Sequence, residues 1–224
     1  MTRAEPPPFP TGLASWKVRR LGLQDYETTW RAMQQFTARR GDSTADEVWF
    51  VEHPAVFTLG YNGKAEHVLA SSAIPLVKTD RGGQVTYHGP GQLVTYLLLN
   101  ITARNLGVRE LVRRLEQAVV DLLSEFDIVA TGCWEAPGVY VEQRKIAALG
   151  LRIRNGCSYH GLALNVAMDL SPFSLINPCG YPGMEVTQLS ELGIDLSVTA
   201  VSERLESHLR RVLGYTSSGS TTEP

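Results

Sequence analysis

The segment from Val108 to Phe126, "VRELVRRLEQAVVDLLSEF", constrains the fold more than any other part of the chain. Its apolar side chains recur at the spacing of a helix and form one stripe, whereas charged side chains occupy the remaining surface. The stripe contains Val108, Leu111, Leu115, Val119, Leu122 and Phe126, and the side chains off it include Arg109, Arg113, Glu116 and Glu125. Such a helix must bury its stripe against another layer, and we expect that layer to be a sheet.

Several other segments have the composition of strands. "EVWFVEHPAVFTLG" is dense in aromatic and β-branched residues but is broken by Pro54, which predicts two short strands or a bent one. "QLVTYLLLNI" is apolar enough for a strand that is buried on both faces. "GVYVEQRKIAALGLRI" and "YHGLALNVAMDL" also predict strands, and the first could be a hairpin that turns near Glu142 to Arg144.

Two further helices follow from apolar spacing. One begins near Tyr26 and ends before Gly41, and the other spans roughly Val198 to Leu213, with Gly214 as its C-cap. Together with the strands they predict an α/β (α+β) fold in which helices pack against the sheet.

The chain of 224 residues is long enough for one well-buried core, and no linker divides it. We therefore expect a single catalytic domain over residues 21–214. The proline-rich start predicts a flexible leader over residues 1–20, and the small polar end predicts a disordered tail over residues 215–224.

Charge and cysteine content limit the partners and the compartment. A formal net charge of -2 without a run of Lys or Arg argues against nucleic acid or an anionic membrane as a partner. The chain contains neither a signal-peptide core nor an apolar stretch of about 18 residues, so we expect no membrane span. Three cysteines without a CxxC motif fit free thiols in a reducing cytoplasm.

The histidines and cysteines show no metal-binding pattern. Neither CxxC nor HExxH spacing occurs, so we expect no metal site. The glycine-rich stretch "DRGGQVTYHGPGQ", from Asp80 to Gln92, lies between two predicted strands. It indicates a close approach of the backbone to a ligand or a purely structural hairpin, and it lacks the pattern of a phosphate-binding loop.

Cys179 lies in a segment, "SLINPCGYPG", that cannot continue a helix or a central strand. Pro178 and Gly180 favour a turn that exposes the thiol, and backbone N–H groups of this turn could form an oxyanion hole. A lysine turned toward such a thiol would favour the nucleophilic thiolate, which makes Lys145 in "RKIAALG" a candidate. Taken alone, the local sequence favours a structural loop cysteine and a solvated lysine at a strand edge.

Four motifs in one order resemble the octanoyltransferases of lipoate biosynthesis. These motifs are "RGGQVTYHGPGQ", "KIAALG", "YHGLALNV" and "NPCG", and the resemblance extends to "EHPAVFTLG" upstream and "VTQL" downstream. It covers roughly Leu21 to Leu213 and leaves out only the two ends. The chain departs from the family pattern at Leu97, Asn100 and Ser158, outside the catalytic motifs.

The resemblance implies a mixed sheet with packed helices, similar to the catalytic domain of biotin and lipoate protein ligases. It implies a cytoplasmic acyltransferase that moves an octanoyl group from acyl carrier protein to a lysine of lipoyl domains. These domains belong to 2-oxoacid dehydrogenase complexes and to the glycine-cleavage H protein. The reaction would pass through an S-acyl-cysteine and would need no ATP or metal, because one thioester replaces another.

Residue roles carry over by motif. The nucleophile and its activating lysine map onto Cys179 and Lys145. His160 is a possible positioning residue, and the general base of the second step stays open between Lys145 and a histidine such as His88 or His160. Residues expected to bind the acyl substrate are Arg81, Gly82, Gly83, Gln84, Val85, Thr86, Tyr87, His88, Ala148, Leu149, Gly150, Gly161, Leu162 and Ala163.

Three other functions are compatible with parts of this pattern. An ATP-dependent lipoate or biotin protein ligase shares the fold but needs no cysteine nucleophile, and the basic loop typical of biotin ligases is missing. A binding module for lipoyl domains or acyl carriers, without catalysis, would not require Cys179 and Lys145. A papain-like peptidase carries its cysteine near the mature N-terminus, before its histidine, which is the reverse of the order here.

Overall fold

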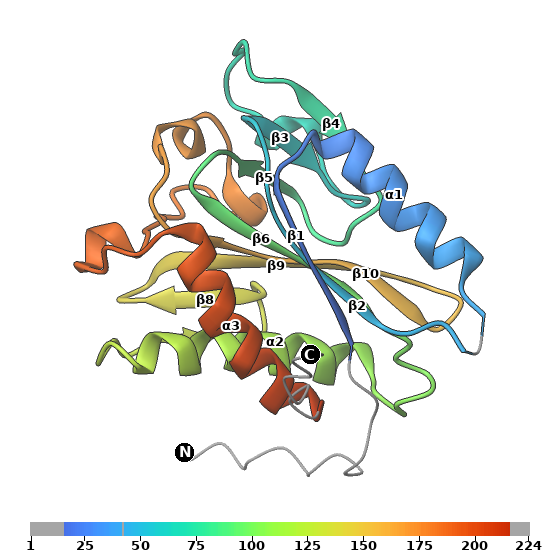
Figure 1. Cartoon of the computed structure of the whole chain (residues 1–224). Helices are drawn as coiled ribbons and strands as arrows, with labels where there is room; N and C mark the ends of the chain where they lie inside the picture. Colours follow the sequence, from blue (N-terminus) through green and yellow to red (C-terminus); the bar gives the residue numbers. More distant parts are fainter. Residues whose placement is uncertain (1–15, 42, 216–224) are drawn as a thin grey trace.

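The structure is a computed structural model, and it describes residues 16–41 and 43–215 (Figure 1). It confirms a mixed α/β fold with two sheets and three α-helices. In chain order the strands and α-helices are β1 Lys17–Leu23, α1 Tyr26–Arg39, β2 Glu47–Glu52, β3 Val56–Leu59, β4 Leu76–Lys78, β5 Val85–His88, β6 Gln92–Leu98, α2 Val108–Ser124, β7 Thr131–Gly132, β8 Gly138–Val141, β9 Arg144–Arg154, β10 Cys157–Asn165 and α3 Val198–Leu213.

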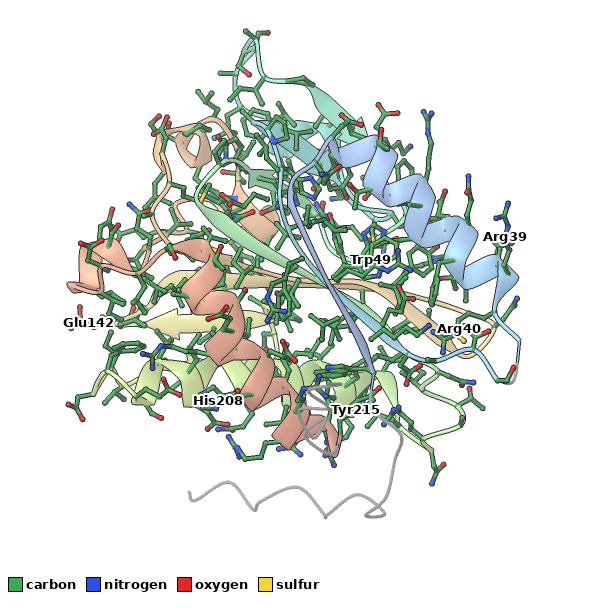
Figure 2. All side chains as sticks on the ribbon, in the orientation of Figure 1. Arg39, Arg40, Trp49, Glu142, His208 and Tyr215 are labelled. Carbon is green, nitrogen blue, oxygen red and sulfur yellow. The ribbon has the colours of Figure 1, made fainter. Side chains whose placement is uncertain are left out.

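The larger sheet has seven strands in the order β1-β2-β6-β10-β9-β8-β7. Only the β1–β2 pair is parallel, and the other neighbours are antiparallel. Strand β6 is buried along its whole length, as its apolar sequence predicts. The predicted hairpin is confirmed as β8 and β9, whose turn is formed by Glu142 and Gln143; Glu142 marks this tip in Figure 2.

The smaller sheet has three strands in the order β4-β3-β5. The strand pair around Pro54 is therefore two short strands that belong to different sheets, β2 in the larger and β3 in the smaller. Proline lacks the N–H that a continuous ladder needs, which explains the break at this point. As a result the small sheet lies over one face of the large sheet, beside α1 (Figure 1).

The helices cover both faces of the large sheet. Helices α2 and α3 pack against each other and against one face, whereas α1 packs against β10 on the other (Figure 1). Four stripe positions of α2 are fully buried, which confirms that this helix packs on the sheet: Leu111, Leu115, Val119 and Leu122. Val108 was wrongly placed in the stripe, because it is the first helical residue and is 43% exposed.

The predicted ends of the domain need correction where the structure describes them. Residues 17–20 of the expected leader belong to β1, because they pair in parallel with β2. Tyr215 is also not part of a tail, since it is buried and its hydroxyl donates to Asp46 Oδ2 at 2.7 Å. The rest of both predicted ends, residues 1–15 and 216–224, lies outside the described residues.

Membrane-spanning helices and metal-binding clusters are both absent from residues 16–41 and 43–215. No helix in these ranges is long and apolar enough to cross a membrane. The same residues contain no group of three or more His, Cys, Asp or Glu side chains arranged to hold a metal ion.

Candidate active site

Lys145 is the second residue of β9, and its main chain is hydrogen-bonded to the segment that follows the cysteine turn. Its N–H donates to the carbonyl oxygen of Glu185 at 2.9 Å, and its own carbonyl accepts from the N–H of Thr187 at 3.0 Å. The segment that follows Cys179 therefore returns to the start of β9. This pairing brings two parts of the chain, 34 residues apart in the sequence, to one place.

The ammonium group of Lys145 is buried among three acceptors. Nζ donates to Cys179 Sγ at 2.9 Å and to the carbonyl oxygen of Pro137 at 3.3 Å. It also lies 5.1 Å from the centre of the Tyr140 ring, a cation–π contact. The lysine is 3% exposed, so it is not the solvated strand-edge residue that the local sequence allowed.

Cys179 occupies the turn Pro178–Gly180, which is fixed to the small-sheet side of the molecule. The N–H of Asn177, just before the turn, donates to the carbonyl oxygen of His67 at 2.8 Å. The backbone of Cys179 is left-handed, with φ 56° and ψ 15°, a conformation that costs a non-glycine residue on the order of 1 kcal/mol. The turn leaves Cys179 partly exposed and turned toward Lys145.

The expected oxyanion hole is not formed by the residues after the cysteine. The N–H of Gly180 donates to the carbonyl oxygen of Asn177 at 2.8 Å, and the N–H of Tyr181 donates to that of Pro178 at 3.1 Å. Both donors are used within the turn itself. The Lys145 ammonium is the donor that lies next to the sulfur.

The charge on Lys145 depends on Cys179. Burial opposes the ammonium form, but the nearby thiolate and hydrogen bonds to Cys179 and Tyr140 outweigh burial, so the pKa of Lys145 lies above its usual value. A raised pKa keeps the lysine protonated. A positive charge therefore lies 2.9 Å from Cys179 Sγ, in a site largely shielded from water.

A pocket opens beside the thiol, and the empty space inside it and at its open mouth together is about 490 Å³. It lies between the large sheet and β5, and Cys179 is part of its wall. Most residues expected to bind the acyl group line it: Arg81, Gly83, Gln84, Val85, Thr86, His88, Ala148, Leu149, Gly150, Gly161, Leu162 and Ala163. The predicted positioning residue His160 lines it too.

Two residues expected to bind substrate do not line this pocket. Tyr87 lies on the opposite side of β5, where its ring packs 5.5 Å from Phe57 and 5.5 Å from Phe173. Successive side chains of a strand point to opposite faces, so the side chain of Tyr87 lies on the face of β5 opposite to those of Thr86 and His88. Gly82 instead joins its loop to β9, because its N–H donates to the carbonyl oxygen of Leu151 at 2.9 Å.

His88 is part of a buried polar chain. Its Nδ1 bonds Gln92 Oε1 at 2.7 Å, and Gln92 Nε2 donates to Asn165 Oδ1 at 2.9 Å. Asn165 Nδ2 then donates at 2.9 Å to the carbonyl oxygen of Thr187, the residue whose N–H bonds Lys145. Burial lowers the pKa of His88 to about 3, so this imidazole is neutral and both of its nitrogens have partners.

His160 is oriented by Asp80. Its Nε2 lies 2.9 Å from Asp80 Oδ1, and the same carboxylate accepts from Trp30, Gln34 and Tyr159. Burial lowers the pKa of His160 despite this carboxylate, so the imidazole is neutral and Nε2 carries the proton given to Asp80. Its Nδ1 is buried and has no hydrogen-bond partner among the described residues.

Three pocket residues were not predicted from the sequence: Tyr26, Val94 and Tyr96. Tyr26 was interpreted only as a member of a helical stripe, and Tyr96 and Val94 only as parts of a buried strand. The signal that could have identified Tyr96 is its polar hydroxyl in a largely apolar strand, whereas Tyr26 and Val94 give no such local signal. Such hydroxyls find partners when buried, as Tyr96 does with His53 Nε2 at 2.7 Å.

Comparison with solved structures shows what the fold is similar to. A lipoate-protein ligase A bound with ATP aligns with a TM-score of 0.75 at 17% identity, covering 92% of this chain and 90% of that one. A bi-partite lipoate protein ligase from Thermoplasma acidophilum gives a TM-score of 0.73 at 18% identity, covering 91% and 86%. Biotin protein ligase from Aquifex aeolicus gives 0.53 at 14% identity, covering 88% and 68%. The expected similarity in fold is confirmed.

Sequence comparison is more specific. An octanoyltransferase of Laribacter hongkongensis is 61% identical over 86% of this chain and 93% of that protein. One of Chromobacterium violaceum is 60% identical over 88% of this chain and 95% of that protein. Residues 25–210 match the family described as the lipoyl protein ligase A/B catalytic domain. The chain therefore belongs to this family and, within it, to the octanoyltransferases.

Proposed function

We propose that the chain transfers an octanoyl group from octanoyl-acyl carrier protein to a lysine of lipoyl domains, through an S-octanoyl intermediate on Cys179. The observation that carries this proposal is the 2.9 Å contact between Lys145 Nζ and Cys179 Sγ, at the edge of the pocket lined by the acyl-binding motifs. The identity to proteins named octanoyltransferase supports the same reaction.

In the first half-reaction the Cys179 thiolate attacks the carbonyl carbon of the carrier thioester. The new S–C bond forms as the carbonyl becomes an oxyanion, which the Lys145 ammonium lies close enough to stabilise. The oxyanion collapses and breaks the bond to the phosphopantetheine sulfur, which leaves and takes up a proton. One thioester replaces another, so the step needs no ATP.

Acylation removes the negative charge that holds Lys145 protonated. Burial, which opposes the ammonium form, is then the main influence on the pKa of Lys145. The proton lost to the leaving thiol can therefore come from Lys145. The lysine that remains is a neutral amine next to the new thioester.

In the second half-reaction the amine of the lipoyl-domain lysine attacks the S-octanoyl carbonyl. Lys145 accepts the proton that the attacking nitrogen loses, an amide N–C bond forms, and the S–C bond breaks to restore the thiolate. The ammonium–thiolate pair is then complete again. His88 is a poor candidate for this base, because both of its ring nitrogens already have partners.

The pocket accounts for the energy of binding a medium-length acyl group. An octanoyl tail has about seven alkyl carbons, and burying them at about 0.8 kcal/mol each contributes about 5 kcal/mol. Small residues of the sheet, Ala148, Gly150 and Gly161, leave room for this tail.

The partners we propose are acyl carrier protein as donor and lipoyl domains of 2-oxoacid dehydrogenases and the glycine-cleavage H protein as acceptors. A fold relative, the Thermoplasma ligase, is described together with its E2 lipoyl domain, which supports the acceptor class. A cytoplasmic location, and activity without ATP or metal, are parts of the same proposal.

Mass spectrometry of the intact protein tests the mechanism. With octanoyl-carrier protein and no lipoyl domain, we expect one octanoyl adduct on Cys179 and none in Cys179→Ala. Adding a lipoyl domain should move the group to its lysine without ATP. Undiminished transfer by Cys179→Ala, or a requirement for ATP, would favour a ligase. Carrier binding without any adduct would favour a binding module.

A further inference from the structure

The side chains of the large sheet that line the pocket are small on β9 and β10 and larger on the next strand, β6. The pocket is floored by Ala148 and Gly150 on β9, then by Gly161 and Ala163 on β10. On the next strand, β6, the lining residues are Val94 and Tyr96. The printed registers place Tyr96 opposite Gly161, and Gly161 opposite Gly150. The larger side chains of Val94 and Tyr96 therefore make the pocket narrower at β6 than at β9 and β10.

Exposure shows which end of the pocket is closed. Gly83 is exposed and Cys179 and Gly150 are partly exposed, so the pocket opens at the thiol. At the other end four rings are buried, and their exposed fractions are 3% for Tyr26, 6% for His88, 3% for Tyr96 and 2% for His160. These four rings, here called the ring wall, all line the pocket.

Three members of the ring wall are tied by hydrogen bonds behind it. Tyr96 is bonded to His53, His88 to Gln92, and His160 to Asp80. The fourth, Tyr26, packs with its ring 5.6 Å from that of His88 at an interplanar angle of 13°. Its hydroxyl also interacts with the side chains of Thr79 and Thr58. Tyr26 is also the first residue of α1, whose N-cap Asp25 accepts from Thr28 N. These contacts hold the four rings in place, so the rings do not move aside for a longer acyl chain.

The thiol and the ring wall lie at different places along the sheet. Cys179 lies beside Lys145 at the start of β9, whereas Tyr96 and Gly161 lie level with Gly150, further along that strand. The five residue steps from Lys145 to Gly150 span about 16 Å of strand. An acyl chain that starts at Cys179 therefore runs along the sheet before it meets the ring wall, and a chain that is too long would reach into the wall.

We propose that the ring wall limits the length of the acyl group and that Tyr26, supplied by α1, is the member that sets this limit. This inference rests on the proposed function, because it assumes that the acyl chain enters the pocket from Cys179. Tyr26 acts on specificity and takes no part in the chemical steps.

The test compares hexanoyl, octanoyl, decanoyl and dodecanoyl thioesters as donors. The measured quantity is the rate at which each forms the adduct on Cys179, followed by mass spectrometry of the intact protein. In Tyr26→Val we expect the decanoyl-to-octanoyl rate ratio to rise at least tenfold, since one methylene that does not fit costs about tenfold or more. Tyr26→Phe keeps the ring and should keep the wild-type ratio.

Tyr87 provides a matched control, since it is a buried tyrosine that packs behind the pocket against Phe57 and Phe173. Tyr87→Val should leave the chain-length ratios unchanged, although it costs a comparable loss of packing. Tyr26→Trp enlarges the ring and should raise the hexanoyl-to-octanoyl ratio about tenfold. This variant decides the question if Tyr26→Val does not fold.

The outcomes separate this inference from the function on which it rests. Unchanged ratios in both Tyr26→Val and Tyr26→Trp, with a normal octanoyl adduct in the wild type, would overturn the role of Tyr26 alone. An equal shift in Tyr87→Val would also overturn it, because the effect would then be general loosening. Failure of the wild type to form any acyl adduct would overturn both proposals.

Discussion

The ammonium of Lys145 lies 2.9 Å from the sulfur of Cys179, although the two residues are 34 positions apart in the sequence. The contact depends on main-chain pairing of Lys145 with Glu185 and Thr187, which anchors the segment after Cys179. The other side of the cysteine turn is anchored to His67. The pair is therefore positioned by the backbone of β9 and by the connection between β3 and β4, which contains His67.

Replacing Lys145 by alanine should make Cys179 less reactive. The ammonium is the opposite charge that stabilises the thiolate, and an opposite charge at this distance changes ionisation by about tenfold or more. We expect the rate of iodoacetamide alkylation at pH 7 to fall about tenfold and the alkylation profile to move to higher pH. Lys64→Ala, which removes an exposed lysine, is the control. An unchanged profile would remove Lys145 from the activating role.

Removing the thiolate should in turn lower the pKa of Lys145. Burial lowers this pKa and Cys179 raises it, so Cys179→Ala leaves burial as the larger influence. A lysine labelled with ¹³C at Cε should then titrate at lower pH than in the wild type, and the exposed Lys78 serves as reference in the same spectrum. The proton transfer proposed for the second half-reaction is wrong if the Lys145 signal does not move.

Gly138 should not tolerate a side chain. A Cβ at this position would lie 2.6 Å from the carbonyl oxygen of Ala147 and 2.9 Å from Lys145 Cε. Gly138→Ala should displace the lysine and slow adduct formation at least tenfold, since small misplacements in an active site are costly. Gly41→Ala, where a Cβ meets no atom within 4 Å, should keep the wild-type rate. Equal rates for both variants would contradict this role of Gly138.

A buried ion-pair cluster far from the pocket should make stability depend on pH. Asp46 pairs with Arg40 and Arg104 and accepts from Tyr215. Burial alone would raise the pKa of Asp46, but the Tyr215 and Asn100 hydrogen bonds and the charge of Arg104 outweigh it and lower the pKa. The carboxylate therefore stabilises the fold above its unfolded pKa of about 3.9, and this contribution is lost as pH falls through the lower folded value.

Asp46→Asn should accordingly unfold at lower temperature than the wild type at pH 7. Breaking a buried pair costs about 3 kcal/mol, and the difference should shrink as pH falls below 4. Thermal unfolding followed by circular dichroism at several pH values measures it. The exposed Asp195→Asn should match the wild type throughout. A constant difference at all pH values would show that the effect of Asp46 is not electrostatic.

The sequence predicted the elements whose signals are local. The final helix was expected over roughly Val198 to Leu213 and is observed with those bounds, because its apolar period and the C-cap at Gly214 lie within the segment itself. The β8–β9 turn was also identified, since a hairpin joins neighbouring residues. The four-motif resemblance gave the family, which sequence comparison confirms.

Features that depend on distant parts of the chain were missed. Tyr26 lies in the pocket only because α1 crosses β10, a contact that helical periodicity does not encode. The local sequence allowed an oxyanion hole formed by N–H groups of the cysteine turn, but the N–H of Gly180 donates to the carbonyl oxygen of Asn177 within the turn. Tyr87 was expected in the pocket together with its neighbours, whereas the alternation of "VTYH" places its side chain opposite those of Thr86 and His88.

At position 179 the stability of the fold and the proposed activity favour different residues, because the backbone there is left-handed. Glycine occupies such a conformation without penalty, so Cys179→Gly would relieve the backbone while removing the nucleophile. A search for thermostable variants that ignores turnover would therefore select against the thiol. Cysteine is therefore kept at this position by its role in acyl transfer and not by the conformational energy of the turn, which glycine would lower.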